Sequence, residues 1–88
     1  MVIAYILAYP QEITSITEYV NTHREKLGRD FRETRTALGW SVEQVAQMAG
    51  VKPVTIEKIE AGKFNVSLDI MVRVADVLSS DVTLKERE

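Results

Sequence analysis

The feature that most constrains this chain is a series of helix start and stop signals set close together between residues 39 and 67. A Ser followed three residues later by Gln forms a capping box at a helix N-terminus. Glycine suits positive φ after a helix or in a tight turn, and proline suits the first helical position. The signals are Gly39, Ser41, Gln44, Gly50, Pro53, Gly62 and Ser67. They predict two short helices joined by a tight turn, at about 41–49 and 53–61, and a further helix at about 67–78.

Two more helices are predicted on the N-terminal side. From about Glu12 to Lys26, apolar residues recur at three- and four-residue spacing, which is typical of an amphipathic helix. They are Ile13, Ile16, Tyr19 and Val20. Gly28 predicts a break, and the stretch from Arg29 to Leu38 reads as a second helix. The fold class is therefore mainly α, a bundle of about five helices.

The two ends of the chain could add short strands. Val2–Tyr9 is apolar throughout and rich in Tyr and Ile, which favour a strand, and Pro10 ends it. Asp81–Lys85 offers a second strand. Because eight exposed apolar residues would invite aggregation, we expect these two segments to form a small sheet that helps to build a homodimer.

The apolar run at the start is too short for a membrane span, which needs about 20 apolar residues, and no Lys or Arg precedes it as in a signal peptide. The sequence thus predicts no membrane association. Three regions are expected: an N-terminal strand and helix at 1–26, a helical domain at 27–80, and a C-terminal strand or tail at 81–88.

Composition removes most enzyme classes. The chain of 88 residues has no cysteine and one histidine, His23, which lacks the partners of a catalytic or metal site. It also lacks a glycine-rich phosphate loop. We expect no catalysis, no metal and no cofactor, and the absence of cysteine suits a reducing cytoplasm. The formal net charge of −2 and the pI near 5.4 argue mildly against nucleic acid binding, so the local charge distribution has to decide.

Two short helices joined by a glycine-containing turn describe a helix-turn-helix. The residues at fixed spacing over about 27–80 resemble the Cro and phage-repressor family, also called the xenobiotic-response-element family. They are Arg35, Gly39, Ser41, Val45, Ala46, Gly50, Val51, Thr55, Ile56, Ile59, Glu60, Gly62, Lys63, Asn65, Ser67, Leu68, Ala75 and Leu78. The resemblance implies a DNA-binding transcriptional regulator, most simply a repressor, which binds a palindrome as a homodimer.

The resemblance also assigns roles to individual residues. It implies a partly buried structural ion pair between Arg35 and Glu60, and it places the helix from Pro53 in the major groove. The positions that match the family's base contacts are Pro53, Val54, Glu57 and Lys58. The phosphate contacts expected around them are Ser41, Gln44, Lys52, Thr55, Lys63 and Asn65. If Arg35 neutralises Glu60, this face is net positive although the chain is acidic.

Two other functions remain open. The chain could be an antitoxin-type interaction module that binds DNA and covers a toxin or another protein partner with its terminal segments. It could also be a helix-turn-helix that has lost DNA binding. Val42, where many members of the family have Gln, together with Pro53, Val54 and the acidic pI, motivates this second alternative.

Overall fold

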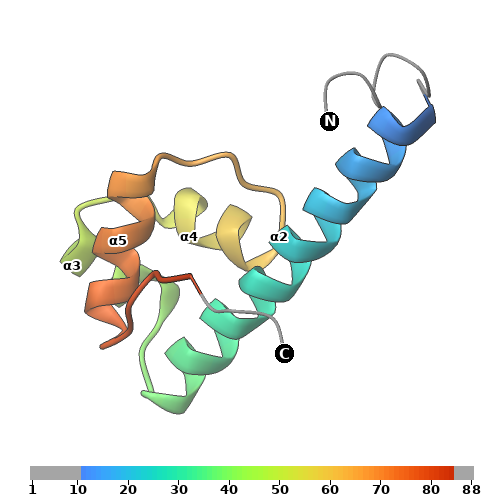
Figure 1. Cartoon of the computed structure of the whole chain (residues 1–88). Coiled ribbons are helices and arrows are strands. Elements are labelled where there is room, and N and C mark those ends of the chain that lie inside the picture. Colours follow the sequence, from blue (N-terminus) through green and yellow to red (C-terminus); the bar gives the residue numbers. More distant parts are fainter. Residues whose placement is uncertain (1–10, 85–88) are drawn as a thin grey trace.

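The computed structural model describes residues 11–84, with side chains from residue 16 onward, and this part of the chain contains four helices and no strand (Figure 1). The helices are α2 (Gln11–Ala37), α3 (Val42–Ala49), α4 (Pro53–Glu60) and α5 (Leu68–Val77). The mainly α, helix-turn-helix class is therefore correct.

The predicted count of about five helices is wrong for the described residues, because the expected break at Gly28 does not exist. The two predicted N-terminal helices form one helix of 27 residues that passes straight through this glycine. Gly28 is buried where α2 meets α4. Because it has no side chain, the two helix backbones can approach each other closely. The division into regions at residues 26 and 80 stays a prediction.

The local signals around α3 and α5 are confirmed. The Ser41 hydroxyl accepts a hydrogen bond from the Gln44 backbone N–H at 3.1 Å, and the Gln44 side chain accepts one from the Ser41 N–H at 2.8 Å. Gly50 ends α3 in the left-handed region at φ 70°. The Ser67 hydroxyl accepts a hydrogen bond from Ile70 at the start of α5. These boundaries follow from local capping chemistry.

One apolar core joins all four helices. α3, α4 and α5 turn apolar stripes inward at the 3.6-residue period, and α2 contributes from its C-terminal part. The buried residues are Phe31 of α2, Val45, Ala46 and Ala49 of α3, Ile56 and Ile59 of α4, Met71, Val74 and Ala75 of α5, and Leu78 just after α5. α4 packs against both α2 and α3, and α5 packs against α3.

The C-terminal segment does not form the predicted strand where the structure describes it. Residues 81–84 have no regular structure, and residues 80–83 line a groove with Leu27 and Phe31 of α2 and with Met71 and Leu78. The predicted strand at Val2–Tyr9 lies outside the described residues, as does Lys85. No helix within residues 11–84 is long and apolar enough to cross a membrane.

Candidate nucleic-acid interface

The unit formed by α3, the turn and α4 is held together by small and branched apolar side chains. Ala46 is 1 % exposed where the two helices cross, and Ile56 and Ile59 turn the inner face of α4 into the core. The Val51 backbone N–H donates to the Ala46 carbonyl at 2.9 Å, and this bond closes the turn after Gly50. The inner face of α4 thus fixes the direction in which its outer face points.

The outer face of α4 carries the four positions predicted to contact base edges. Pro53, Val54, Glu57 and Lys58 are all exposed. At 3.6 residues per turn these positions fall on one side of the helix, opposite the buried Ile56 and Ile59. The structure therefore presents all four predicted positions together on an accessible helix face.

The N-terminus of α4 carries no side-chain cap. Lys52 occupies the N-cap position with extended backbone angles and makes no capping hydrogen bond. Pro53 follows it and has no backbone N–H to satisfy. The partial positive charge at the start of a helix favours an anion there, and the exposed Lys52 adds a full charge. This end of α4 can accept a phosphate.

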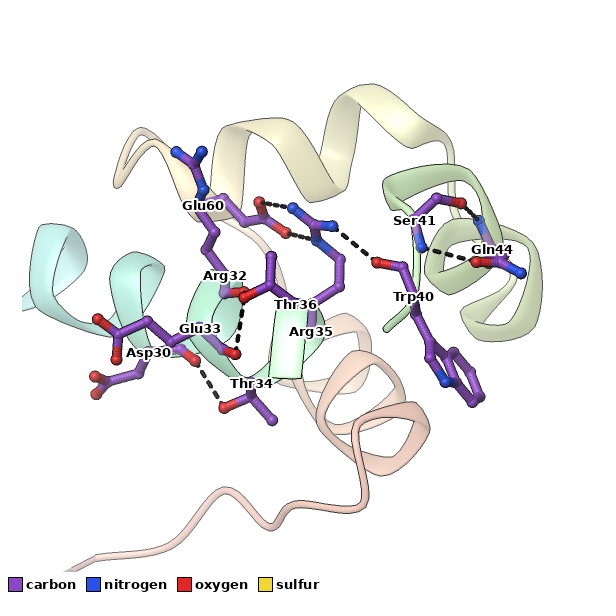
Figure 2. A network of polar contacts seen from close by, with 10 residues as sticks. All are labelled: Asp30, Arg32, Glu33, Thr34, Arg35, Thr36, Trp40, Ser41, Gln44 and Glu60. Atoms are coloured by element: carbon purple, nitrogen blue, oxygen red, sulfur yellow. Dashed lines mark hydrogen bonds and ion pairs between the residues drawn. The ribbon is translucent and has the colours of Figure 1, made fainter. Parts of the chain in front are cut away.

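Arg35 and Glu60 form a bidentate ion pair between α2 and α4 (Figure 2). Arg35 donates from Nε to Glu60 Oε2 at 2.6 Å and from Nη2 to Oε1 at 2.9 Å. Its Nη1 donates to the Trp40 carbonyl at 2.9 Å, just before the Ser41 cap. The two side chains are 13 % and 11 % exposed, so the pair is largely removed from water. One guanidinium thus ties together α2, the end of α4 and the approach to α3.

The pairing also affects the ionisation of Arg35. The hydrogen bonds to Glu60 raise the pKa of the guanidinium above its ordinary value, and the charges of Glu60 and Glu43 act in the same direction. Partial burial lowers the pKa of Arg35, but the hydrogen bonds and charges that raise it together outweigh this effect. Arg35 therefore stays charged at any pH at which the protein would be used, and it offsets the negative charge of Glu60.

Two glycines let α2 approach the C-terminal end of α4. A Cβ at Gly28 would overlap the carbonyl oxygen of Ile59 and lie 2.9 Å from that of Glu60. A Cβ at Gly62 would lie 2.7 Å from the Cα of Glu25, and Gly62 also has φ +72°. The backbones of α2 and the end of α4 are therefore in direct contact, and no larger residue fits at either position without a backbone shift.

The residues predicted to contact phosphate fall into three groups. Ser41 and Gln44 hold each other in the capping box, which uses the Gln44 amide oxygen and leaves its nitrogen outside the box. Lys52 and the half-buried Thr55 flank the start of α4. The third group is Lys63 and Asn65, both exposed in the loop after α4.

Arg24 was not among the contact residues predicted from the sequence. This side chain lines a shallow hollow with Lys63 and Asn65, and its Nη1 donates to Asn21 Oδ1 at 2.9 Å. It was missed because the predicted break at Gly28 separated residues 1–26 from the helical domain. A continuous α2 lays Arg24 beside the loop after α4 and adds a cation to the same surface.

The comparisons with known proteins agree with this geometry. A family model described as helix-turn-helix matches residues 31–84. The restriction-modification controller protein C.AhdI from Aeromonas hydrophila is 33 % identical, with a TM-score of 0.65 over 68 % of this chain and 91 % of that one. The clp gene regulator ClgR from C. glutamicum is 29 % identical, with a TM-score of 0.64 over 67 % of this chain and 76 % of that one. No curated protein is significantly similar in sequence to this chain.

Fold, site and comparisons together define a DNA-binding regulator of the helix-turn-helix class. The chain belongs to the helix-turn-helix family of Cro/C1 type, the xenobiotic-response-element family.

Proposed function

We propose that this protein binds duplex DNA sequence-specifically through α4 and regulates transcription, as a repressor, in the form of a homodimer on a palindromic site. The observation that supports it best is the orientation of α4. Its inner face is buried, its C-terminal end is held by the Arg35–Glu60 pair, and its N-terminal end and outer face are open. A helix held in this way can enter the major groove with its N-terminal residues against base edges.

We assign distinct roles to the side chains of this outer face. Lys58 can donate to guanine O6 and N7, and Glu57 can accept from cytosine N4. Pro53 and Val54 offer apolar contact to thymine methyl groups. The motif we expect therefore combines a guanine or a G·C pair with at least one thymine.

The surrounding cations supply the affinity that does not depend on sequence. Lys52 and Lys63 flank α4 at its two ends, and Arg24 lies beside Lys63. Arg35 offsets the charge of Glu60. Glu57 is therefore the one acidic side chain of α4 whose charge no ion pair offsets. An acidic chain can thus present a locally positive face to phosphates.

The deciding experiment selects bound duplexes from a random pool with the full chain, followed by titration of the selected duplex and a scrambled one at several salt concentrations. We expect a two-fold symmetric motif, tight binding that weakens steeply with salt, and weaker binding of the scrambled duplex. A full chain that is folded by circular dichroism but binds no duplex at low salt would overturn the proposal. So would binding that is equal for all sequences.

The matched control is a pair of charge removals. Lys52→Ala takes a cation from the start of α4, and Arg29→Ala takes one from an exposed position on α2 outside the proposed contact residues. Both variants have the same net charge. A loss of affinity confined to Lys52→Ala supports the interface, whereas equal losses would show that only overall charge matters.

A further inference from the structure

The part of α2 that precedes the body, residues 11–27, is named the arm here. In Figure 1 it extends beyond the other three helices. Its contact with the body is on one side, where Arg24 and Glu25 line the hollow beside the loop after α4. The other described side chains of the arm, from residue 16 onward, are exposed.

The arm exposes a continuous apolar stripe. Ile16, Tyr19, Val20 and Leu27 are 45 %, 53 %, 39 % and 39 % exposed. At 3.6 residues per turn these four fall within one side of the helix, together with His23, whose ring packs edge-on against Tyr19 at 4.3 Å between centroids. Exposed polar side chains occupy the opposite side, namely Glu18, Thr22 and Arg29. Single exposed apolar residues are ordinary, but an ordered stripe on an amphipathic helix marks a contact surface.

The stripe does not end with the arm. Leu27 also lines the groove of about 310 Å³ between α2 and the segment after α5, whose walls include Phe31, Met71 and Leu78. The arm and this groove therefore form one apolar surface along α2. A stable protein interface buries about 800 Å² on each partner, which is more than a few isolated side chains supply. The continuous apolar surface of the arm and the groove is suited to an interface of that size.

The spacing within the stripe is the same in both chain directions. Ile16, Val20, His23 and Leu27 follow one another at intervals of four, three and four residues. This alternation is the seam spacing of paired helices. If a second arm runs in the opposite direction, Ile16 lies opposite the partner's Leu27 and Val20 lies opposite the partner's His23. A second copy of the chain is thus a geometric complement of the first.

Charge favours the reversed direction. Residues 11–18 contain two acids and no base, whereas residues 23–29 contain three bases and one acid. Two antiparallel arms place the acidic part of each beside the basic part of the other, while parallel arms place like charges together. The same register brings the first turn of the partner's α2 beside Asp30 and Phe31, at the groove.

We propose that the arms of two copies of this chain pair in an antiparallel manner, with Ile16 of each against Leu27 of the other, and that this pairing builds the dimer. The proposal rests on the homodimer of the proposed function and names its surface. It assigns the dimer to residues that precede the part of the chain matched by the family model.

The first test measures the oligomeric state of the full chain without DNA, by sedimentation equilibrium over micromolar concentrations. We expect a dimer for the unmodified chain, and a dissociation constant raised about tenfold or more by Val20→Glu and by Ile16→Glu. The matched control is Val72→Glu on α5, where the valine is 48 % exposed, and it should leave the dimer intact. A monomeric unmodified chain, or a dimer broken by Val72→Glu and not by the arm variants, overturns the proposal. Circular dichroism checks that each variant is folded.

The second test determines the direction and register of the paired arms by disulfide trapping. The chain has no cysteine of its own, so only the introduced cysteines can cross-link. A disulfide needs Cα atoms about 4.4–6.8 Å apart. Ile16→Cys mixed with Leu27→Cys should give the mixed disulfide under mild oxidation. Neither variant alone should cross-link, because two copies of position 16 would lie about 16 Å apart along antiparallel helices. Cross-linking of Ile16→Cys with itself shows parallel arms and overturns the proposal, as does the absence of any mixed disulfide.

The two proposals fail separately. Binding of the selected duplex by the folded Val20→Glu variant is measured beside its oligomeric state. If the chain dimerises through the arm but binds no duplex, the arm proposal stands and the DNA proposal fails. If duplex binding is tight while the arm variants leave the dimer unchanged, the DNA proposal stands and the arm proposal fails.

Discussion

α4 and the arm of α2 are both exposed helices, but the body holds them in different ways. α4 has its inner face in the core and its C-terminal end fixed by the Arg35–Glu60 pair. The arm is attached at one end, and the four apolar side chains of its stripe are 39–53 % exposed. The exposed face of α4 combines the charged Glu57 and Lys58 with Pro53 and Val54. The exposed stripe of the arm is mostly apolar.

The difference shows which chemistry each surface can meet. A helix that must place donors and acceptors against base edges has to be held from behind, because small displacements cost specific hydrogen bonds. A helix that pairs through apolar contacts does not need to be held from behind in the same way. Apolar burial is not directional, so the partner helix itself can fix the position of the pair. The following experiments test this contrast between a held helix and an arm.

The largest effect is expected from breaking the ion pair that holds α4. Arg35→Ala and Glu60→Ala each leave the other charge largely buried and unpaired, which costs about 3–5 kcal/mol of unfolding free energy. Denaturant unfolding without DNA measures this loss, and Arg29→Ala on the exposed side of α2 serves as the control. If both variants unfold at the same denaturant concentration as the unmodified chain, the pair does not hold α4.

Gly28→Ala tests the backbone contact between α2 and α4. Alanine normally stabilises a helix interior by about 1 kcal/mol relative to glycine. Here its Cβ would meet backbone atoms of Ile59 and Glu60, which cannot move aside as a flexible side chain would. We expect a net loss of about 1–3 kcal/mol in unfolding free energy. Lys26→Ala, an exposed position two residues earlier, should have little effect, and a stabilised Gly28→Ala would contradict the close contact.

Lys58→Ala tests the outer face of α4. If Lys58 donates to guanine, its removal weakens binding of the selected duplex by about 1–3 kcal/mol and relaxes the preference at one base pair. Unfolding free energy should stay the same, because the side chain is exposed. Competition between duplexes that differ at single positions gives the measurement. A motif unchanged by Lys58→Ala would move this lysine from base recognition to phosphate contact.

Lys63→Ala should have a smaller and uniform effect. Phosphate contacts carry no sequence information, so all duplexes should lose affinity alike. The slope of log affinity against log salt should fall by about one. Arg24→Ala, from the same hollow, should behave in the same way. A loss limited to the preferred sequence would contradict this role for Lys63.

The smallest effect is expected in the arm. Ile16→Ala, measured at concentrations where the chain is monomeric, should change unfolding free energy by less than about 0.5 kcal/mol, because the side chain is 45 % exposed. Ile59→Ala in α4 is the opposite case, since this residue is fully buried, and should cost about 2–5 kcal/mol. A large loss for monomeric Ile16→Ala would show that the arm folds onto its own body.

Local chemistry explains which parts of the fold were predictable. The capping box of Ser41 and Gln44, the turn at Gly50 and the start of α4 at Pro53 depend on residues a few positions apart, and each is where the sequence placed it. The resemblance supplied the partnership of Arg35 and Glu60, which are 25 residues apart. No local pattern could have paired them.

The errors came from features that depend on distant partners. A glycine within a helical pattern can end the helix or allow close packing, and only the backbone of α4 beside Gly28 decides between them. The role of Arg24 depends on the same contact. Residues 81–84 alternate in the manner of a strand, but the structure sets residues 80–83 along the groove with α2, without strand pairing.

The unbroken course of α2 through Gly28 has a consequence for operator architecture. A continuous helix packed backbone against backbone on the end of α4 can act as a lever, so a change in the length of the arm would move the arm relative to α4. If the arms form the dimer contact, the number of residues between the stripe of the arm and Gly28 sets the distance between the two half-sites, about 34 Å for one DNA turn. An insertion of four residues between Leu27 and Gly28 would lengthen each arm by about 6 Å and turn its stripe by about 40°. Selection with such a variant would then return half-sites moved apart, with the sequence of each half-site unchanged.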